Sequence, residues 1–329
     1  MKAHTLLHDT NRPSCRAQRC LGINVHPLRK GQPSMNSLPI AHIGILVADV
    51  GTARRHWSNA LGESFSPIVR YRAAAWSDLA DPTPHANDLR QAVYIGVNPS
   101  IEIQEFGNNG THAPSHGEGG YHIAFAPIAD NSTLRRELAE LGIEMDGTSN
   151  YDGRSIVQFT EARALNNVAT EWIEASPGHH DLKDDGSPVD RLPDGSSTVF
   201  DAQTILALKG QRPPSGIVEF GVLVSNLEKA IGPWSAVTGY PFDTSTNSER
   251  SAVSRGAVPA IRLVEASEVS AREGLYYAVV ETDNVEATLE RLRRSQVPLV
   301  HATSGRRGDA EVDPTYLNGF SLRFVGFQD

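Results

Sequence analysis

Apolar and polar residues recur along this chain in one repeating order. A short apolar run typical of a strand is followed by an amphipathic run typical of a helix, and then by three more strand-like runs. The first copy predicts a helix at 52–61 and strands at 41–48, 65–72, 91–97 and 100–106. The second copy predicts a helix at 132–141 and strands at 121–127, 144–149, 155–160 and 169–175. Both helical runs end in Leu-Gly, so the repeating unit is a whole βαβββ module.

The second half of the chain begins the same order twice more. One copy opens with Gly-Ile-Val-Glu219-Phe-Gly-Val-Leu-Val-Ser-Asn-Leu and continues into a helical run that ends at Thr238-Gly239. The other opens with Leu-Tyr-Tyr277-Ala-Val-Val-Glu-Thr-Asp-Asn-Val, followed by a predicted helix over 285–295. The chain therefore contains four such modules, which predicts an α+β fold.

Composition divides the chain into four parts. Residues 1–37 contain Lys2, Arg12, Arg16, Arg19, Arg29 and Lys30 against one acid, Asp9. This composition predicts a disordered tail. An organelle transit peptide, or a start codon chosen upstream of Met35, would give the same composition. Asp, Gly, Pro and Ser dominate a predicted linker at 179–214. The linker separates predicted domains at 38–178 and 215–329, and we expect a cytoplasmic protein.

Charge narrows the choice of partner. The 329 residues have a formal net charge of -9, which argues against nucleic acid because phosphate binding needs clustered Lys and Arg. No apolar run approaches the ~20 residues that span a bilayer, so we expect no membrane partner. A small-molecule substrate and a monomer or homodimer are the expectations that remain. The two cysteines, Cys15 and Cys20, both lie in the tail, so a metal in either domain needs nitrogen and oxygen ligands.

Two histidines and two glutamates stand at equivalent positions of the first two modules. The opening strands read Ile-Ala-His42-Ile-Gly and Gly-Tyr-His122-Ile-Ala, and the closing strands read Ser-Ile-Glu102-Ile-Gln-Glu and Ala-Thr-Glu171-Trp-Ile-Glu. A single histidine on a strand is usually a core residue, but a pair at equivalent repeat positions indicates a shared role. Glu171 lies on a short apolar strand, where a carboxylate is costly to bury without a cation. Glu102 is the weaker candidate, because Gln104 shares its face.

These modules and residues resemble the vicinal oxygen chelate superfamily over most of residues 38–329. That superfamily includes glyoxalase I, methylmalonyl-CoA epimerase, extradiol dioxygenases, and the bleomycin and fosfomycin resistance proteins. The resemblance implies that modules pair into two domains with U-shaped mixed sheets. It also implies one divalent metal, whether Zn, Ni, Co, Mn or Fe(II), and no other cofactor. The metal ligands it implies are His42, Glu102, His122 and Glu171.

The second half resembles a degenerate copy of the same domain. Alignment by eye places Glu219 at the position of His42, Arg262 at that of Glu102, Tyr277 at that of His122, and Leu322 at that of Glu171. Because these four side chains do not form a divalent metal site, we expect one metal per chain. An arginine in the old cleft could still bind an anion.

The four-ligand set most resembles the glyoxalase and epimerase members. The resemblance implies an isomerase, epimerase or lyase that moves a proton beside a carbonyl in a small, metal-chelated substrate, with Glu171 or Glu102 as ligand and base. Leu46 and Phe106 stand where bacterial glyoxalase I holds glutathione with Arg and Asn, which argues against a glutathione substrate.

Two alternatives stay open. An Fe(II) dioxygenase of the extradiol type would use His42, His122 and Glu171, with His112, His116 or Tyr151 as acid or base; we select His116 as the catalytic candidate of the 107–120 loop. A metal-free drug-binding protein would need none of these residues. The connection at 73–90, which contains Trp76, is either a lid, a substrate wall or an insertion without function.

Overall fold

The computed structural model describes residues 38–62, 65–94, 99–126, 128, 131–151, 154–173, 216–245, 250–267, 272–302 and 308–326. The expected tail at 1–37 and linker at 179–214 lie outside these ranges. Residues from Pro33 onward form one compact unit. No helix among the described residues is long and apolar enough to cross a membrane.

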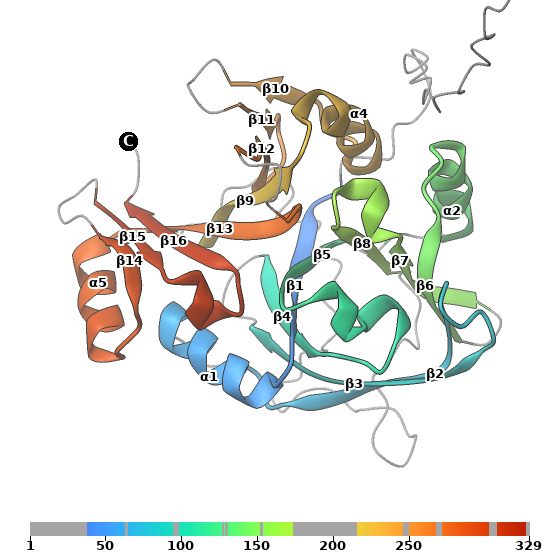
Figure 1. The fold of residues 1–329 in the computed structure, drawn as a ribbon, viewed down its shortest axis with the longest axis horizontal. Helices are drawn as coiled ribbons and strands as arrows, with labels where there is room; N and C mark the ends of the chain where they lie inside the picture. The colour runs from blue at the N-terminus through green and yellow to red at the C-terminus, as the bar shows by residue number, and fades with distance from the viewer. Residues whose placement is uncertain are drawn as a thin grey trace, which may run out of the picture. The chain divides into compact units, whose positions relative to one another are not determined.

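The first two modules form a closed eight-stranded barrel in the order β1-β4-β3-β2-β6-β7-β8-β5 (Figure 1, blue through green). Its elements are β1 (Ile40–Val47), α1 (Val50–Leu61), β2 (Val69–Ser77), β3 (His85–Tyr94), β4 (Ser100–Glu105), β5 (Gly119–Phe125), α2 (Asn131–Glu140), β6 (Met145–Tyr151), β7 (Arg154–Thr160) and β8 (Ala169–Ile173). β1 pairs with β4 in parallel and with β5 antiparallel. The barrel closes further than the expected U shape, because β2 pairs with β6 at Trp76↔Ser149 and Ser77↔Thr148.

The other two modules form one open eight-stranded sheet in the order β10-β11-β12-β9-β13-β16-β15-β14 (Figure 1, yellow to red). Its elements are β9 (Gly216–Val224), α4 (Leu227–Thr238), β10 (Phe242–Thr244), β11 (Ser251–Ser254), β12 (Ala260–Glu265), β13 (Gly274–Thr282), α5 (Val285–Arg294), β14 (Leu299–Ala302), β15 (Asp309–Val312) and β16 (Ser321–Gly326). The mixed sheets and few helices confirm the predicted α+β class.

The same local chemistry begins the helix in three of the modules. Asp49, Asn226 and Asn284 each stand one residue before a helix, and the side chain of each accepts a hydrogen bond from the backbone N–H three residues later. Such a cap satisfies one of the donors that the first turn leaves unpaired. Because the cap sets where each helix starts, it also sets where the preceding strand stops.

The two faces of β1 have different surroundings. On β1, Ile43 and Ile45 are fully buried in the core beneath α1, together with Trp57 of that helix. Successive strand residues point to opposite faces, so His42, Gly44 and Leu46 face the barrel interior. The face of β1 toward α1 packs in the hydrophobic core, and the face toward the barrel interior carries His42.

Two connections of the barrel contain regular structure. Of the 73–90 connection, residues up to Ser77 belong to β2 and residues from His85 belong to β3. Trp76, at 1 % exposure, packs inside the barrel with Phe159. The loop after β4 forms two 3-10 turns, η1 (Gly110–His112) and η2 (Pro114–His116), with Thr111 and His112 buried.

Candidate metal centre

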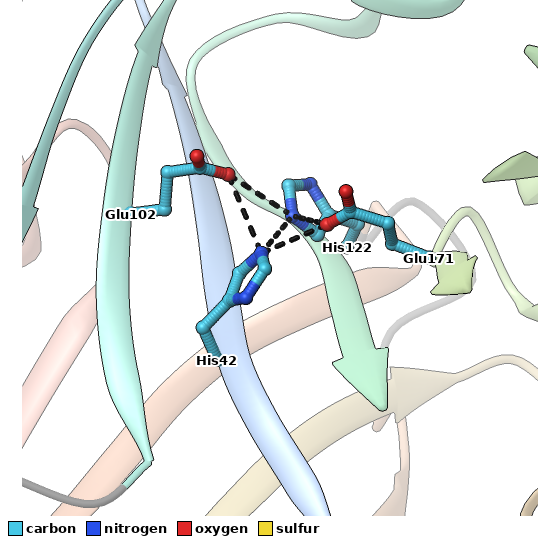
Figure 2. Close-up of side chains that lie close together, drawn as sticks. All are labelled: His42, Glu102, His122 and Glu171. Carbon is cyan, nitrogen blue, oxygen red and sulfur yellow. Dashed lines mark hydrogen bonds and ion pairs between the residues drawn. The ribbon is translucent and has the colours of Figure 1, made fainter. Parts of the chain in front are cut away.

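The four residues selected from the sequence lie together inside the barrel. His42 is on β1, Glu102 on β4, His122 on β5 and Glu171 on β8, which are four consecutive strands of the barrel. Figure 2 shows the four side chains pointing toward one another. None is more than 7 % exposed, and one ligand atom of each lies within 4.8 Å of those of the other three.

The atoms that meet are the two imidazole Nε2 atoms and one oxygen of each carboxylate. His42 Nε2 lies 2.8 Å from Glu171 Oε2 and 3.4 Å from Glu102 Oε2. His122 Nε2 lies 3.2 Å from Glu171 Oε2 and 3.5 Å from Glu102 Oε2. The two Nε2 atoms are 3.1 Å apart. Five of the six pairs among these four atoms are therefore close.

These distances fit a shared metal ion. Donor atoms ~2.1 Å from a metal are ~3.0 Å apart at right angles and ~3.4 Å apart at tetrahedral angles. Glu171 Oε2 is buried, and no donor is aligned with it as a hydrogen bond even though two imidazole nitrogens lie within 3.2 Å. Two neutral imidazoles and two carboxylates also balance a divalent charge. The cluster therefore suits a divalent cation of the first transition row.

Gly44 makes room for His122. In the strand register, Gly44 stands opposite Glu102 on β4 and opposite His122 on β5. A Cβ at position 44 would lie 1.8 Å from His122 Cε1, a separation that no side chain tolerates. The missing side chain thus lets the imidazole lie across β1 and reach His42.

Charge in the cluster follows from two opposed effects. Burial alone lowers the pKa of His42, but Glu171 and then Glu102 outweigh it and raise that pKa to about 9. Burial raises the pKa of Glu171, but His42 and His122 lower it more, so that its pKa falls below the usual range. Without a metal, the cluster therefore carries protonated histidine beside ionised carboxylate.

The second sheet places an ion pair at the equivalent position. Gly221 stands opposite Arg262 on β12 and opposite Tyr277 on β13, as Gly44 stands opposite Glu102 and His122. A Cβ on Gly221 would lie 1.7 Å from the Tyr277 ring, which repeats the close approach of the barrel.

Three of the four aligned residues meet there. Arg262 Nε and Nη2 each donate to a different oxygen of Glu219 at 2.8 Å, and Tyr277 Oη donates to Glu219 Oε1 at 2.6 Å. Burial, followed by the Glu219 charge, raises the pKa of Tyr277, so its hydroxyl stays protonated. Here a guanidinium supplies the positive charge that a metal would supply in the barrel.

The fourth aligned residue of the second half was misplaced by one position. Glu171 stands opposite Ala124, two residues beyond His122, and the same register on β16 reaches Arg323 opposite Val279. Leu322, which the alignment by eye selected, is fully buried in the core. Arg323 instead ion-pairs with Asp309. A one-residue slip exchanges the two faces of a strand, which is why the error moved the position from the cleft into the core.

The loop histidines occupy different environments. His112 is 3 % exposed, and its ring contacts those of Trp76, Tyr121 and Phe159. His116 is half-buried; its Nε2 lies 3.2 Å from Gly110 O and its ring contacts Tyr121. The side chain of Tyr151 lies outside the described residues. His112 is thus the loop histidine buried beside the metal cluster, a distinction that the sequence pattern alone did not contain.

An aromatic wall adjoins the cluster, and of its rings the sequence reasoning named Trp76 and Phe106 but not Phe159 or Tyr121. The rings of Phe159 and Tyr121 contact the ring of His122 at 5.2 and 5.9 Å between centroids. Leu46, Val157, Ala162, Ala169 and the partly buried Phe106 belong to the same group. No Lys or Arg is among the buried side chains of the described residues.

Comparisons with known proteins identify the fold. No family model and no curated protein matches this chain. Among solved structures, a mutant of 4-hydroxymandelate synthase from Streptomyces coelicolor is 12 % identical, with a TM-score of 0.56, over 89 % of this chain and 94 % of that one. A xylose isomerase-like TIM barrel/4-hydroxyphenylpyruvate dioxygenase fusion protein is 12 % identical, with a TM-score of 0.53, over 88 % of this chain and 50 % of that one. A Streptomyces coelicolor methylmalonyl-CoA epimerase in complex with 2-nitronate-propionyl-CoA is 17 % identical over 35 % of this chain and 98 % of that one, with a TM-score of 0.30.

The protein has the vicinal oxygen chelate fold, in a two-domain arrangement. The similarity to 4-hydroxymandelate synthase extends over both halves of this chain. The resemblance drawn from the four modules is therefore confirmed at the level of the fold. Its barrel carries a cluster that suits one divalent metal.

Proposed function

We propose that this protein is a metal-dependent enzyme that moves a proton beside a carbonyl in a small substrate, acting as an isomerase, epimerase or lyase. The observation that carries the proposal is the convergence of four ligand atoms from His42, Glu102, His122 and Glu171 inside the barrel. When bound there, a divalent ion supplies electrophilic polarisation of the carbonyl, which makes the neighbouring C–H acidic.

The chain's own residues would bind and move the proton. The two imidazoles hold their Nε2 atoms 3.1 Å apart and fix the common point at which all four donors meet. Glu171 or Glu102 would act as ligand and also accept the proton, since each has a second carboxylate oxygen. The four side chains are at most 7 % exposed, and burial strengthens electrostatic interactions at the cluster. His116 lies in the loop of η1 and η2 and stays a second catalytic candidate.

The substrate we propose is small and has two neighbouring oxygens. An octahedral ion with four protein ligands would have two further positions for substrate oxygens, and the wall beside the cluster is aromatic. A long nucleotide or peptide carrier would need cationic partners, and no Lys or Arg is buried among the described residues. We therefore expect free 2-oxo and 2-hydroxycarbonyl compounds to be better substrates than thioesters of large carriers.

A second candidate function is an Fe(II) dioxygenase that cleaves a catecholic ring. The aromatic wall of Trp76, Phe159 and Tyr121 favours it, because such rings stack with a planar aromatic substrate. His42, His122 and Glu171 would supply the two-histidine, one-carboxylate ligand set of such enzymes. The two proposals share the metal and differ in the reaction.

One experiment separates these proposals. The protein is purified anaerobically, its metal content is measured by mass spectrometry, and oxygen uptake is followed with a panel of catechols. In parallel, NMR in D2O follows hydrogen exchange beside the carbonyl of 2-oxo and acyl-thioester compounds. Zn, Ni, Co or Mn with exchange and no oxygen uptake supports proton transfer, whereas stoichiometric iron with oxygen uptake supports the dioxygenase. A protein that takes up no metal would be a small-molecule binding protein instead.

A further inference from the structure

We infer that a cavity on the outer wall of the barrel binds a small zwitterion, a free α-amino acid with an apolar side chain, and that this ligand stabilises the loop of η1 and η2. The cavity has a volume of about 580 Å³. It lies where the end of β2 and the turn after it meet β6 and α2. The inference goes beyond the proposed reaction and does not depend on it, because none of the four cluster residues lines this cavity.

The cavity and the metal cluster lie on opposite sides of β6. Asp146, Thr148 and Asn150 alternate along this strand, and all three line the cavity. Successive strand residues point to opposite faces, so Gly147 faces the barrel interior, where a Cβ would lie 2.4 Å from the Trp76 ring. A ligand in the cavity is therefore separated from the metal cluster by the wall of the barrel.

The cavity contains a carboxylate without a counter-ion. Asp146 is half-buried, and its Oδ1 accepts a hydrogen bond from Leu79 N at 3.2 Å. No Lys or Arg forms an ion pair with Asp146 among the residues that the structure describes. Burial raises the pKa of Asp146, and the charge of nearby Asp78 raises it further, against the opposing effect of the Leu79 hydrogen bond. An ammonium group beside Asp146 would stabilise its ionised form.

A guanidinium from α2 supplies the opposite charge. Arg135 lines the cavity, and its Nη2 donates to Thr148 Oγ1 at 3.4 Å. No carboxylate pairs with this guanidinium in the described ranges. Thr148 stands two residues from Asp146 on the same face of β6, a separation of ~7 Å. The ammonium and carboxylate of an α-amino acid, with one hydrogen bond at each end, span a gap of this order.

The other two carboxylates of the lining leave this balance unchanged. Asp78 is buried, and its two oxygens accept hydrogen bonds from Trp76 Nε1 and from the backbone N–H groups of Thr111, Ala80 and Asp81. Four donors therefore compensate its charge. Glu144 is exposed, so water and salt screen it. The charges left for a ligand are the carboxylate of Asp146 and the guanidinium of Arg135.

Apolar side chains complete the lining, namely Leu79, Pro82, Ala139, Ile143 and Met145. Leu79 is 54 % exposed, and it is one of three large hydrophobic side chains that face solvent among the described residues. An apolar side chain of the ligand that covered Leu79 would remove apolar surface from water. Leucine has this side chain together with both charged groups.

The cavity adjoins the residues that hold the loop of η1 and η2. Leu79, which bonds to Asp146, directly follows Asp78 in the chain, and Asp78 accepts a hydrogen bond from the N–H of Thr111 in η1. A ligand bound to Asp146 therefore restrains the turn to which the loop is tied. We expect it to slow the opening of this loop, because a ligand that binds only the closed form stabilises that form.

Isothermal titration calorimetry of the full chain with L-leucine tests the site. We expect about one equivalent to bind with a Kd of ~1 mM or lower. Two analogues should bind ~10-fold more weakly: 3-methylbutylamine, which lacks the carboxylate, and 4-methylpentanoate, which lacks the ammonium. Arg135→Gln and Asp146→Asn should weaken L-leucine binding by a similar factor. Arg136→Gln and Glu140→Gln are the matched controls, since both residues are exposed on α2 and lie outside the cavity lining.

Each result supports or overturns the inference. No saturable binding of L-leucine, or equal binding of either analogue, overturns it. Binding that persists in Arg135→Gln and Asp146→Asn overturns it too, as does binding that is lost in His122→Ala, since that loss would place the amino acid at the metal cluster.

Hydrogen exchange at 107–118 supplies the second readout. At a concentration ~10 times its Kd, L-leucine should slow this exchange up to ~10-fold in the wild type and not in Asp146→Asn. Unchanged exchange in the wild type refutes the link to the loop. None of these measurements depends on metal content, so the proposed function is tested separately.

Discussion

The imidazole of His122 occupies the space where any residue but glycine at position 44 would place its side chain. The Cβ of such a residue would lie 1.8 Å from His122 Cε1. Since Gly44 stands between Glu102 and His122 in the strand register, this one position controls whether two of the four ligands can approach each other.

Gly44→Ala should therefore abolish metal binding. The added methyl group must displace either the His122 ring or the β1–β5 pair, and overpacking of this kind costs ~1–3 kcal/mol of stability. Metal content and the free energy of unfolding check the prediction. Gly51→Ala is the control, because a Cβ there meets only ordinary contacts and alanine favours a helix. A Gly44→Ala protein that keeps one metal per chain would contradict the assignment of His122 as a ligand.

His122→Ala and Tyr277→Ala should have different effects although they change equivalent positions. The first should reduce bound metal from about one equivalent to a trace while the fold persists, because three ligands remain but one coordination position is lost. The second should leave metal content unchanged, since the described hydrogen bond of the Tyr277 hydroxyl goes to Glu219 in the second sheet. Mass spectrometry of both variants, with circular dichroism for the fold, tests this. A loss of metal in Tyr277→Ala would mean that the second half is not inert.

Arg262→Met should lower the free energy of unfolding without changing the metal content. It leaves Glu219, whose side chain is 18 % exposed, with the Tyr277 hydroxyl and no cation, and an uncompensated, partly buried carboxylate costs ~1–3 kcal/mol. Adding Glu219→Gln should restore part of the loss, because the unpaired charge disappears. Urea unfolding of the single and double variants measures both effects. If the double variant is as unstable as Arg262→Met, charge is not the cause.

Metal affinity should rise steeply with pH between 6.5 and 9. In the metal-free protein the pKa of His42 is raised from 6.5 to about 9. The interaction of protonated His42 with its carboxylate partners therefore stabilises the folded protein fully below pH 6.5, and this stabilisation is lost as pH rises through 9. Metal needs the neutral imidazole and must displace that proton, which predicts up to about a tenfold gain in affinity per pH unit for each proton released. Zinc titration calorimetry in buffers of different ionisation enthalpy counts the protons. An affinity that does not vary over this range would rule out a protonated cluster.

Asp78→Ala should loosen the loop that carries His112. Asp78 accepts hydrogen bonds from Trp76 Nε1 and from the backbone N–H groups of Thr111, Ala80 and Asp81. Losing several charge-assisted bonds at a buried site should cost ~2–4 kcal/mol, and hydrogen exchange at 107–118 should accelerate. Asp81→Ala is the control, because the Asp81 side chain is exposed and caps only its own turn at Thr83, besides a pair with His85. Equal exchange in both variants would show that Asp78 does not hold the loop.

The sequence predicted the cluster because the repeat supplied two independent copies of each position. His42 and His122 lie on the first strands of their modules, so the order of the modules alone predicted that both side chains face the same interior. Arg323 was missed because strand phase depends on pairing register, and a run such as Ser-Leu-Arg-Phe-Val fits either phase. His112 and His116 lie in a loop without periodicity. Their burial depends on 3-10 turns and on Asp78, a residue more than thirty positions away in the chain.

The ion pair of Arg262 and Glu219 has a consequence for the life of the protein in a cell. A guanidinium is a positive charge attached by covalent bonds, so starvation for metal or a competing chelator does not remove it. The Glu219 carboxylate therefore keeps its counter-charge at every metal concentration. The second half carries a built-in cation at the position where the barrel gathers donors for one that must be acquired.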